Sequence, residues 1–468
     1  MTGIVTRLDE HARERGAHRA IVLEGLSIDY VGLRRLVGQT IVALAKDGVT
    51  PEDVVGIQVA DEVRHLVLSL AVLGLGATQL TLPTHDSHQL NATVARRAAA
   101  SRVLLDVDAG RLVDLHSQGT SPDLPSGPIG EPEGRLYLRT SGTTGDMNIV
   151  SMSEAQLAAQ SLRHADYAAE RLLRLASIEY NNSKRHRLYC VWAGGTNVFR
   201  PRGPLDIVDY CVRHEVTCLD ISRIHAADLL NVNEVHRLSD VKVRTGGSGV
   251  PYSVRWAIEE RVTPLLFVRY AATECGGISM AGPGEHDEDE SVGSPLDGVR
   301  VQIVDGEGRL QATSEAGHIR VMAPGMAVGY LDSSNDTARR FRDGWFYPGD
   351  VGSLREDGSL VIHGRSDEMI IFNGLNIFPS EIERELAAHP AVVAAVALGL
   401  PSGVHGQIPV AVVQLAQGST VSERDLVKHG RASLSLRAPR RIILVDAIPV
   451  GPHGKIQRGA LARLFDRS

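Results

Sequence analysis

The fold of this chain is decided by the stretch Leu136-Tyr137-Leu138-Arg139-Thr140-Ser141-Gly142-Thr143-Thr144-Gly145. Apolar and aromatic residues with the spacing of a short strand lead through Arg139 into a run made only of Thr, Ser and Gly. Glycine lets the backbone turn tightly near a ligand, and hydroxyl and N–H groups can cradle phosphate oxygens. Ser153 and Gln156 have capping-box spacing and predict a helix running to Leu175. The prediction is strand, phosphate-type loop and helix; a polar connection that binds nothing is the alternative.

Length and composition exclude several classes of protein. A chain of 468 residues is too long for one core, so we expect two or more domains. A net charge of −7 and only 4% aromatic residues argue against nucleic acid as a partner. The sequence has no apolar run of membrane-spanning length and no signal-peptide pattern. We therefore expect a cytoplasmic enzyme without a membrane partner. The four cysteines fit no zinc spacing and are expected to be free thiols.

The first part of the chain alternates predicted helices and strands. Residues 4–14 and 33–44 have helical periodicity, and residues 54–59 and 78–82 look like buried strands. Such alternation predicts an α/β core with parallel strands and crossover helices. Residues 118–134, rich in Gly, Pro, Ser and Glu, are expected to form a surface connection.

Two more strands run into glycine-rich loops. Residues 241–244 lead into Thr245-Gly246-Gly247-Ser248-Gly249, and residues 265–270 lead into Ala271-Ala272-Thr273-Glu274-Cys275-Gly276-Gly277. Open α/β sheets place ligands just beyond the carboxyl ends of their strands. Three such loops predict a ligand site where the strands end.

The pattern changes after Val299. Short strands separated by Asp-Gly turns predict antiparallel β structure, and a capping-box spacing from Ser380 to Glu383 predicts a helix. Strands are predicted at residues 392–398, 409–415 and 441–445. We expect a large N-terminal α/β domain at residues 1–366, built from parallel α/β subdomains and a small β-barrel-like subdomain. A small, mobile α+β domain is expected at residues 367–468.

The order of these motifs resembles the adenylate-forming superfamily, which includes acyl- and aryl-CoA synthetases, adenylation domains of peptide synthetases, and firefly luciferase. The resemblance covers essentially the whole chain. Its motifs stand at residues 140–145, 246–247, 270–274 (Tyr-Ala-Ala-Thr-Glu), 344–350 (Gly-Trp-Phe-Tyr-Pro-Gly-Asp), 364–367 (Gly-Arg-Ser-Asp), 373–383 and 449–458.

The resemblance implies a role for each motif. The loop Thr140, Ser141, Gly142, Thr143, Thr144 and Gly145 would bind the ATP phosphates. Gly246, Gly247 and Tyr270 would line the adenine pocket, and Asp350 and Arg365 would hold the ribose. Lys455 would be the adenylation lysine, Asp367 the hinge of the C-terminal domain, and Gly374 part of the tunnel for the thiol acceptor.

These side chains also suit the chemistry by themselves. Attack of a carboxylate on an α-phosphate concentrates negative charge, so positioning and cations dominate catalysis. Glu274 is a hard oxygen ligand of the kind that Mg²⁺ accepts beside phosphates and water. Thr273 offers a hydroxyl to phosphate, Asp350 can accept two ribose hydroxyls, and Lys455 supplies a positive charge. A surface ion pair for Glu274 and a turn for Asp350 are the alternatives.

The sequence departs from the family pattern at Asn148. The family's phosphate loop continues Gly-x-Pro-Lys-Gly, whereas this chain reads Gly145-Asp146-Met147-Asn148-Ile149. Loss of the lysine is expected to weaken contacts to the β- and γ-phosphates by about 1–3 kcal/mol. Because Glu274, Asp350 and Lys455 are present, we predict weaker activity rather than none.

A second departure concerns the acyl pocket. Many relatives have an apolar stretch with a histidine where this chain has Tyr180-Asn181-Asn182. If the polar side chains here face the pocket, the acid is expected to be small and polar, such as an amino or hydroxy acid. The alternative is a solvated loop with residues 184–187 on the surface. The candidate pocket residues are Glu179, Tyr180, Asn181, Lys184, Asp220 and Ser222.

The sequence thus predicts an ATP- and Mg²⁺-dependent ligase that turns a small carboxylic acid into an acyl-adenylate. The acyl group is then expected to pass to a thiol, either CoA or the phosphopantetheine of a carrier protein supplied in trans. Transfer to an amine or another nitrogen or oxygen nucleophile is one alternative, and a non-catalytic nucleotide-binding relative is another.

Overall fold

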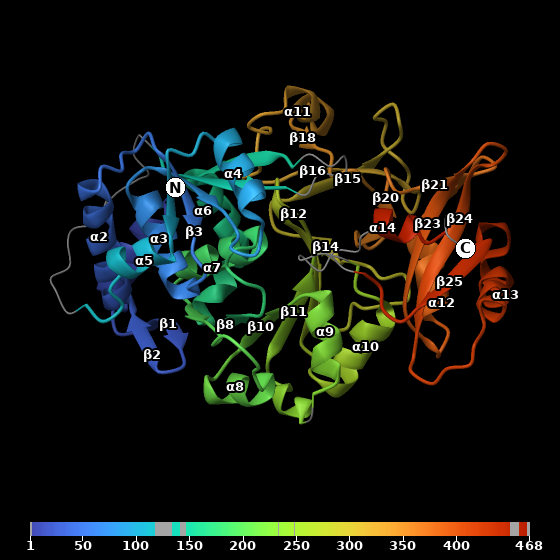
Figure 1. Ribbon diagram of the computed structural model, residues 1–468, viewed down its shortest axis with the longest axis horizontal. Coiled ribbons are helices and arrows are strands. Elements are labelled where there is room, and N and C mark those ends of the chain that lie inside the picture. Colours follow the sequence, from blue (N-terminus) through green and yellow to red (C-terminus); the bar gives the residue numbers. More distant parts are fainter. Residues whose placement is uncertain are drawn as a thin grey trace.

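A computed structural model describes residues 2–117, 133–140, 147–232, 234–247, 249–449 and 458–465. Its N-terminal part, at the left of Figure 1, is built around a sheet of strand order β5-β3-β4-β6-β7. The elements up to the second sheet are α1 (Ile4–Glu14), β1 (Arg19–Leu23), β2 (Leu26–Asp29), α2 (Tyr30–Lys46), β3 (Val54–Gln58), α3 (Glu62–Gly74), β4 (Thr78–Thr81), α4 (His88–Arg97), β5 (Arg102–Leu105), α5 (Asp106–Leu112), β6 (Arg135–Arg139) and β7 (Ile149–Ser153).

The strand predicted at the start of the stretch 136–145 is present as β6, and the segment after Ser153 differs from the prediction. β6 pairs parallel with β4, and β7 returns antiparallel to β6 after the loop. Ser153 and Gln156 form the predicted capping box, in which Gln156 N donates to Ser153 Oγ at 3.2 Å. The prediction that this helix continues to Leu175 is wrong. α6 (Glu154–Ser161) is followed by a 3₁₀ segment, η1 (Leu162–Ala169), in which His164 leaves helical geometry.

The second sheet carries most of the sequence motifs. Among the described residues it has nine strands in the order β14-β13-β12-β11-β10-β8-β9-β1-β2, and its core from β12 to β1 is parallel. Both N-terminal sheets are mixed rather than purely parallel. The elements are β8 (Arg171–Arg174), α7 (Asn181–Ala193), β9 (Thr196–Val198), α8 (Ile207–Arg213), β10 (Cys218–Ile221), α9 (Arg223–Leu230), η2 (Val235–Leu238), β11 (Lys242–Gly246), α10 (Tyr252–Arg261), β12 (Leu266–Ala272), β13 (Gly276–Ala281) and β14 (Ser294–Pro295).

Helix α7 is the largest correction to the sequence prediction. The solvated-loop interpretation of residues 177–187 is wrong, because α7 packs against α1, α3, α6 and η1 and its residues 183–191 are all buried. The prediction was wrong because residues 184–187 are all basic, and a segment of polar composition normally faces solvent. No helix in the described ranges is both long and apolar enough to cross a membrane. All four cysteines are buried and unpaired, as predicted.

The segment after Val299 forms an open sheet of order β17-β18-β16-β19-β20, with β15 paired to β16. The predicted Asp-Gly turns are present; Asp343 (φ 52°) and Gly344 (φ 77°) form the two-residue turn between β17 and β18. The barrel-like expectation is corrected, because the described strands do not close. The elements are β15 (Arg300–Val304), β16 (Gly317–Met322), α11 (Ser334–Arg340), β17 (Phe341–Arg342), β18 (Trp345–Phe346), β19 (Asp350–Leu354) and β20 (Leu360–Arg365).

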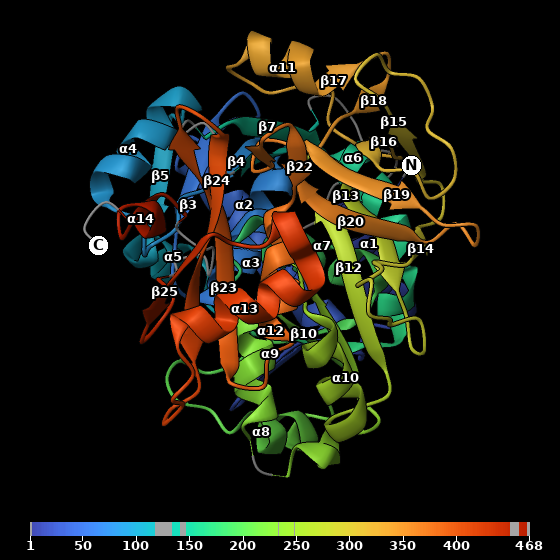
Figure 2. The same cartoon turned by 90° about the vertical axis from the view of Figure 1, so that its right-hand side faces the viewer.

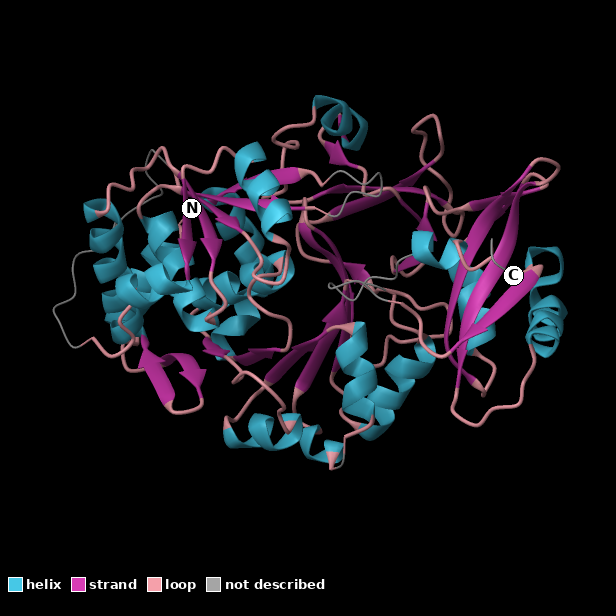
Figure 3. Cartoon of the chain, in the orientation of Figure 1, coloured by secondary structure: helices cyan, strands magenta, loops and turns pink. Residues whose placement is uncertain are grey.

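The C-terminal part is a sheet of order β22-β21-β24-β23 with β25 beside β24, covered on one face by α12 and α13 and on the other by α14. Figure 2 looks at it from its own side, and Figure 3 shows the helices flanking its long strands. The cap of α12 differs from the prediction, because Glu381 caps Phe378 N while Ser380 Oγ donates to His363 O. The elements are β21 (Ile370–Phe372), β22 (Leu375–Ile377), α12 (Pro379–Ala387), β23 (Val392–Ser402), β24 (Gly406–Leu415), α13 (Glu423–Leu434), η3 (Ser435–Arg437), β25 (Arg441–Val445) and α14 (Arg458–Ala462).

The end of α7 offers a test of this packing. A Cβ at Gly195 would lie 2.0 Å from Tyr167 O, so Gly195→Ala must displace backbone. We expect it to lower the free energy of unfolding by about 1–3 kcal/mol, the usual cost of overpacking, in urea titrations. Gly110→Ala is the matched control, since a Cβ there has open space. Equal stability of the two variants would contradict the close packing at α7.

Candidate functional site

The candidate site lies where β10, β11 and β12 end. These strands are parallel, so Ser222, Gly247 and Thr273 follow their carboxyl ends at one edge. Gly246 is in register with Arg269, and a Cβ on Gly246 would lie 2.5 Å from Arg269 O. Gly247 has φ +85°, which favours glycine. Both glycines are therefore required by the backbone before any ligand is considered.

A chain of hydrogen bonds joins three of the predicted nucleotide residues. Tyr270 Oη donates to Asp350 Oδ2, and Arg365 Nη1 donates to Asp350 Oδ1 at 3.2 Å. Arg365 also donates from Nε and Nη2 to the two oxygens of Asp367, each at 3.1 Å. Burial and then the Asp350 carboxylate raise the pKa of Tyr270 well above its ordinary value, so this phenol remains a donor. Strands β12, β19 and β20 thus bring Tyr270, Asp350 and Arg365 together, next to Asp367.

Glu274 lies in the hairpin between β12 and β13. It is 8% exposed, and its Oε1 accepts a hydrogen bond from Tyr330 Oη at 2.8 Å. The carbonyl oxygen of the neighbouring Thr273 accepts a hydrogen bond from Arg185 Nη1 at 3.0 Å. The described residues hold no group of three His, Cys, Asp or Glu that could bind a metal by itself. A single carboxylate still fits Mg²⁺, which usually takes one or two carboxylates together with phosphates and water.

Asn148 closes the base of the phosphate-type loop. Its carbonyl oxygen accepts a hydrogen bond from Thr140 N at 2.8 Å, and its Nδ2 donates to Asp336 Oδ2 at 3.1 Å. That hydrogen bond is the main cause of the lowered pKa of Asp336, on α11. Asn148, which stands where the family pattern has a lysine, is therefore hydrogen-bonded to an acidic residue, Asp336. Ser141, Gly142, Thr143, Thr144, Gly145 and Lys455 lie outside the described residues.

Three of the candidate acyl-pocket residues meet the edge of the first sheet. Glu179 accepts hydrogen bonds from Thr84 N at 2.5 Å and Thr84 Oγ1 at 3.2 Å. The Tyr180 ring lies 5.3 Å from that of His85. Asn181 Nδ2 donates to the carbonyl of Arg139, the last residue of β6. Asn181 therefore contacts the residue that enters the phosphate-type loop, and Glu179 and Tyr180 contact the segment that follows β4.

The other three candidate acyl-pocket residues, Lys184, Asp220 and Ser222, have partners elsewhere in the structure. Lys184 is 0% exposed and donates from Nζ to Gln79 Oε1 at 3.1 Å. Asp220 is bound by two arginines, Arg174 and Arg269. Ser222 Oγ lies 3.0 Å from His225 Nδ1 at the start of α9. The surface interpretation of residues 184–187 is wrong, because all four are buried.

Sequence reasoning missed several residues of this region. Arg269 lies between Asp220 and His186, with Nη1 2.8 Å from His186 Nε2, and Tyr167 Oη is 2.7 Å from His186 Nδ1. A signal was present, since Arg269 interrupts the apolar run of β12 and Arg174 directly follows two buried leucines of β8. Tyr330, the partner of Glu274, carries no local signal because it comes from a distant loop.

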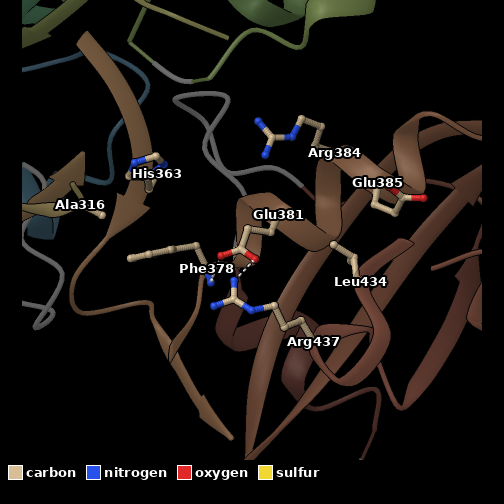
Figure 4. A pocket seen from close by; sticks show the side chains of 8 residues that line it. All are labelled: Ala316, His363, Phe378, Glu381, Arg384, Glu385, Leu434 and Arg437. Atoms are coloured by element: carbon tan, nitrogen blue, oxygen red, sulfur yellow. Dashed lines mark hydrogen bonds and ion pairs between the residues drawn. The ribbon is translucent and has the colours of Figure 1, made fainter. Parts of the chain in front are cut away.

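A separate pocket of about 410 Å³ lies at the junction of β20 with the C-terminal helices. Figure 4 shows Arg437 pointing toward Glu381, with Phe378 and His363 beside them. Arg437 Nη1 lies 2.5 Å from Glu381 Oε2. None of the candidate site residues lines this pocket, and the two motif residues that do, Phe378 and Glu381, have no assigned chemical role, so we place the chemistry at the strand ends instead. Its lining is Ala316, His363, Phe378, Glu381, Arg384, Glu385, Leu434 and Arg437.

Comparison with known protein families gives two matches along the chain. The model of the AMP-binding enzyme family matches residues 8–331, well over half of the sequence. The chain belongs to this family. The model of the AMP-binding enzyme C-terminal domain matches residues 381–455, which ends at Lys455. The chain is thus an enzyme of the adenylate-forming superfamily. Asp350, Arg365, Asp367 and Gly374 fall between the two matched ranges.

Individual relatives agree with this assignment. The chain is 30% identical to "Novobiocin biosynthesis protein H" of Streptomyces niveus, over 96% of this chain and 80% of the relative. It is 24% identical to "Oxalate--CoA ligase" of Arabidopsis thaliana, over 98% of each. The ATP-bound structure of MatB from Rhodopseudomonas palustris is 25% identical with a TM-score of 0.85 over 99% of both chains. The amide bond synthetase McbA from Marinactinospora thermotolerans has the same fold, at 24% identity with a TM-score of 0.87 over 99% of this chain and 100% of McbA.

Burial of Lys184 predicts a pH-dependent stability. Burial lowers the pKa of Lys184 from 10.5 to about 7, although Glu179 opposes this shift. Between these values the unfolded chain binds a proton that the folded chain does not, so the folded protein gains stability as pH rises. Lys184→Met removes this dependence. Urea titrations should show that the free energy of unfolding of Lys184→Met, relative to that of the unchanged protein, is most favourable near pH 7. This difference is expected to shrink toward pH 10.

The matched control is Lys46→Met, which removes an exposed lysine at the end of α2. Its effect on stability is expected to be the same at every pH. A difference between Lys184→Met and the unchanged protein that does not vary with pH would contradict a neutral, buried Lys184.

Replacing Asn148 by lysine is predicted to strengthen ATP binding. Asn148→Lys restores a cation beside the phosphate-type loop and is expected to lower the apparent KM for ATP by roughly fivefold or more. Asp336 can capture the new ammonium, so Asn148→Lys with Asp336→Asn is the matched variant. An unchanged KM for ATP in both variants, measured by pyrophosphate release, would show that the lost lysine does not limit ATP binding.

Proposed function

We propose that the protein activates a small carboxylic acid with ATP and Mg²⁺ to an acyl-adenylate, and then passes the acyl group to a thiol. The observation that carries the proposal is the hydrogen-bonded set Tyr270, Asp350 and Arg365, in which Tyr270 lies on β12, four residues before Glu274. A carboxylate that can bind hydroxyls and a carboxylate that can bind a metal suit a nucleoside triphosphate. Membership of the AMP-binding enzyme family supports it.

The chain's own residues account for nucleotide binding. The backbone and hydroxyls of Thr140 and residues 141–145 would hold phosphate oxygens, and Gly246-Gly247 with Tyr270 would receive the adenine. Asp350 would accept the ribose hydroxyls, with Arg365 holding that carboxylate in place. Glu274 would hold Mg²⁺, which neutralises phosphate charge when bound.

The first half-reaction follows from these positions. A carboxylate oxygen of the acid attacks the α-phosphorus, and the bond to the pyrophosphate oxygen breaks as the new P–O bond forms. Negative charge grows on the α-phosphate oxygens in the transition state, so nearby N–H, hydroxyl and ammonium donors lower the barrier. Thr273 and Lys455 are assigned to this task.

The second half-reaction is assigned to the C-terminal domain, which we delimit at residues 367–468. Asp367 lies between β20 and β21, where Ser380 Oγ to His363 O is one of the contacts across the junction. Rotation about Asp367 would bring Gly374, in the Asn373-Gly374 turn between β21 and β22, to the acyl-adenylate. That turn would then border the path of the thiol.

The acceptor is proposed to be CoA or a carrier-protein phosphopantetheine. Relatives named as CoA ligases and as the fatty acid--[acyl-carrier-protein] ligase ScoC of Streptomyces coeruleorubidus support a thiol. The second candidate is transfer to an amine, which the fold of the amide bond synthetase McbA favours. The acid is proposed to be small and polar, because Asn181 contacts the residue that enters the phosphate-type loop, and Glu179 and Tyr180 contact the segment that follows β4.

The test is ATP-dependent pyrophosphate release over a panel of carboxylic acids. We expect release with small polar acids and loss of at least about a hundredfold in rate for Lys455→Ala, because it removes a cation from the transition state. The product formed with CoA, a loaded carrier protein or an amine, identified by mass, distinguishes the acceptors. Bound ATP with no pyrophosphate release from any acid would contradict the proposed function.

A further inference from the structure

Helix α11 contacts two separate parts of the candidate site. Near its start, Asp336 accepts a hydrogen bond from Asn148 Nδ2 at 3.1 Å, at the base of the phosphate-type loop. The next residue, Thr337, accepts at its Oγ1 a hydrogen bond from the backbone N–H of Tyr330 at 2.9 Å. Tyr330 in turn donates to Glu274. The helix therefore connects the phosphate-type loop to the partner of the proposed metal ligand.

A third contact of α11 is made by its last residue, Arg340. Arg340 Nη1 donates to the carbonyl oxygen of Tyr347 at 3.2 Å, and the backbone N–H of Tyr347 donates to the carbonyl oxygen of Arg340 at 2.7 Å. A Cβ on Gly349 would overlap Arg340 Nη1 and lie 3.0 Å from its Cζ. The guanidinium thus lies against the backbone that leads directly into Asp350, the proposed ribose carboxylate.

Arg340 has no acidic partner within the described ranges of the chain. Its side chain bonds only the carbonyl oxygen of Tyr347 there. The neighbouring Arg339, by contrast, is exposed and pairs with Asp336 at 2.8 Å. Arg340 is partly buried, so its charge is partly removed from water. A guanidinium has five N–H donors in a fork that matches phosphate oxygens, and most of those on Arg340 are free for a ligand.

The other polar side chains beside the proposed nucleotide site do not supply an unpaired cation. Asn148 stands where the family pattern has a lysine, and its neutral amide is bonded to Asp336. Arg365 is charged, but it donates to both Asp350 and Asp367. The phosphate chain of ATP carries several negative charges, which cations and N–H donors stabilise. A further cation at this place would therefore strengthen ATP binding.

Arg340 lies near both ends of the path that the phosphates would take. With the ribose on Asp350 and Mg²⁺ on Glu274, the phosphate chain runs between these two carboxylates. The guanidinium lies against the residue before Asp350, and its charge also reaches Tyr330, the partner of Glu274. Burial, and then the Glu274 carboxylate, raise the pKa of Tyr330, while the charge of Arg340 opposes this rise.

We propose that Arg340 binds the phosphate chain of ATP and supplies the cation that Asn148 does not. This inference rests on the proposed function and adds a residue to its nucleotide site. The guanidinium would donate to phosphate oxygens in charge-assisted hydrogen bonds and keep its bond to Tyr347. Adenosine has no phosphate, so its binding should not depend on Arg340.

The test measures the binding of adenosine, AMP and ATP with Mg²⁺ to the full chain by calorimetry, with no acid present. Arg340→Gln removes the charge but keeps a donor for Tyr347. We expect it to weaken ATP binding roughly tenfold or more and to leave adenosine binding unchanged. Arg340→Lys keeps the charge and should retain part of the affinity. A loss for AMP as well would place Arg340 at the α-phosphate, and a loss for ATP alone at the outer phosphates.

The matched control is Arg342→Gln, which removes the same charge from an exposed arginine two residues farther along the chain. It is expected to leave the affinity for ATP unchanged. An equal loss of ATP affinity in Arg342→Gln and Arg340→Gln would show a general effect of net charge and overturn the inference.

A cycle of variants tests whether Arg340 replaces the missing lysine. Asn148→Lys with Asp336→Asn places an ammonium at the base of the phosphate-type loop. If both cations serve the same phosphates, Arg340→Gln should cost less ATP affinity in this background than in the unchanged chain, by roughly twofold or more. Equal losses in the two backgrounds would overturn this replacement.

The outcomes separate this inference from the proposed function. Unchanged ATP affinity in Arg340→Gln, or an equal loss for adenosine, overturns the inference, because Arg340 would then act only through the backbone at Gly349. A loss confined to ligands with phosphate supports it even if no acid leads to pyrophosphate release, whereas that silence overturns the proposed function. Absence of ATP binding to the unchanged chain overturns both.

Discussion

The burial of α7 between the two N-terminal sheets is the constraint on which the rest of the structure depends. Its polar residues 184–187 are buried, so each side chain needs a hydrogen-bond partner in the surrounding elements. Those partners are Gln79 on β4, Gln160 on α6, Arg269 on β12, and Glu62 at the start of α3. Besides the apolar contacts of residues 188–191, α7 is thus held by directional polar ones. The positions of β12 and of the motif that follows it are therefore coupled to α7.

The sequence predicted best where local signals are strong. The N-terminal helix at residues 4–14, the final strand at 441–445 and the Asp-Gly turns agree with the structure, because periodicity and turn chemistry act over a few residues. The secondary-structure prediction failed between Leu162 and Arg187, where tertiary contacts determine which residues form helix, strand or loop. Leu172 and Leu173 fit a helix or a strand equally well, and only the neighbouring strands β9 and β10 make them a strand.

The candidate site shows the same division. Tyr270, Asp350 and Arg365 were identified from their motifs, and the structure brings them into one hydrogen-bonded chain. Tyr330 and Asp336 were missed because each contributes one side chain from a segment with no pattern of its own. Asp220 was predicted as a candidate acyl-pocket residue, and two arginines share its carboxylate. Spacing along a chain can indicate which residues carry chemistry, but it cannot indicate how charge is balanced in three dimensions.

Arg365 donates hydrogen bonds to two carboxylates to which different roles are assigned, and also to the carbonyl oxygen of Pro348. One nitrogen holds Asp350, at the proposed ribose site, while two others hold Asp367, at the proposed hinge. Displacing the backbone at Asp367 must break both of the latter bonds and leave those donors to water or to Asp350. The guanidinium that holds the proposed ribose carboxylate therefore also holds the proposed hinge residue, and under the proposed function nucleotide binding and domain rotation would act on the same side chain.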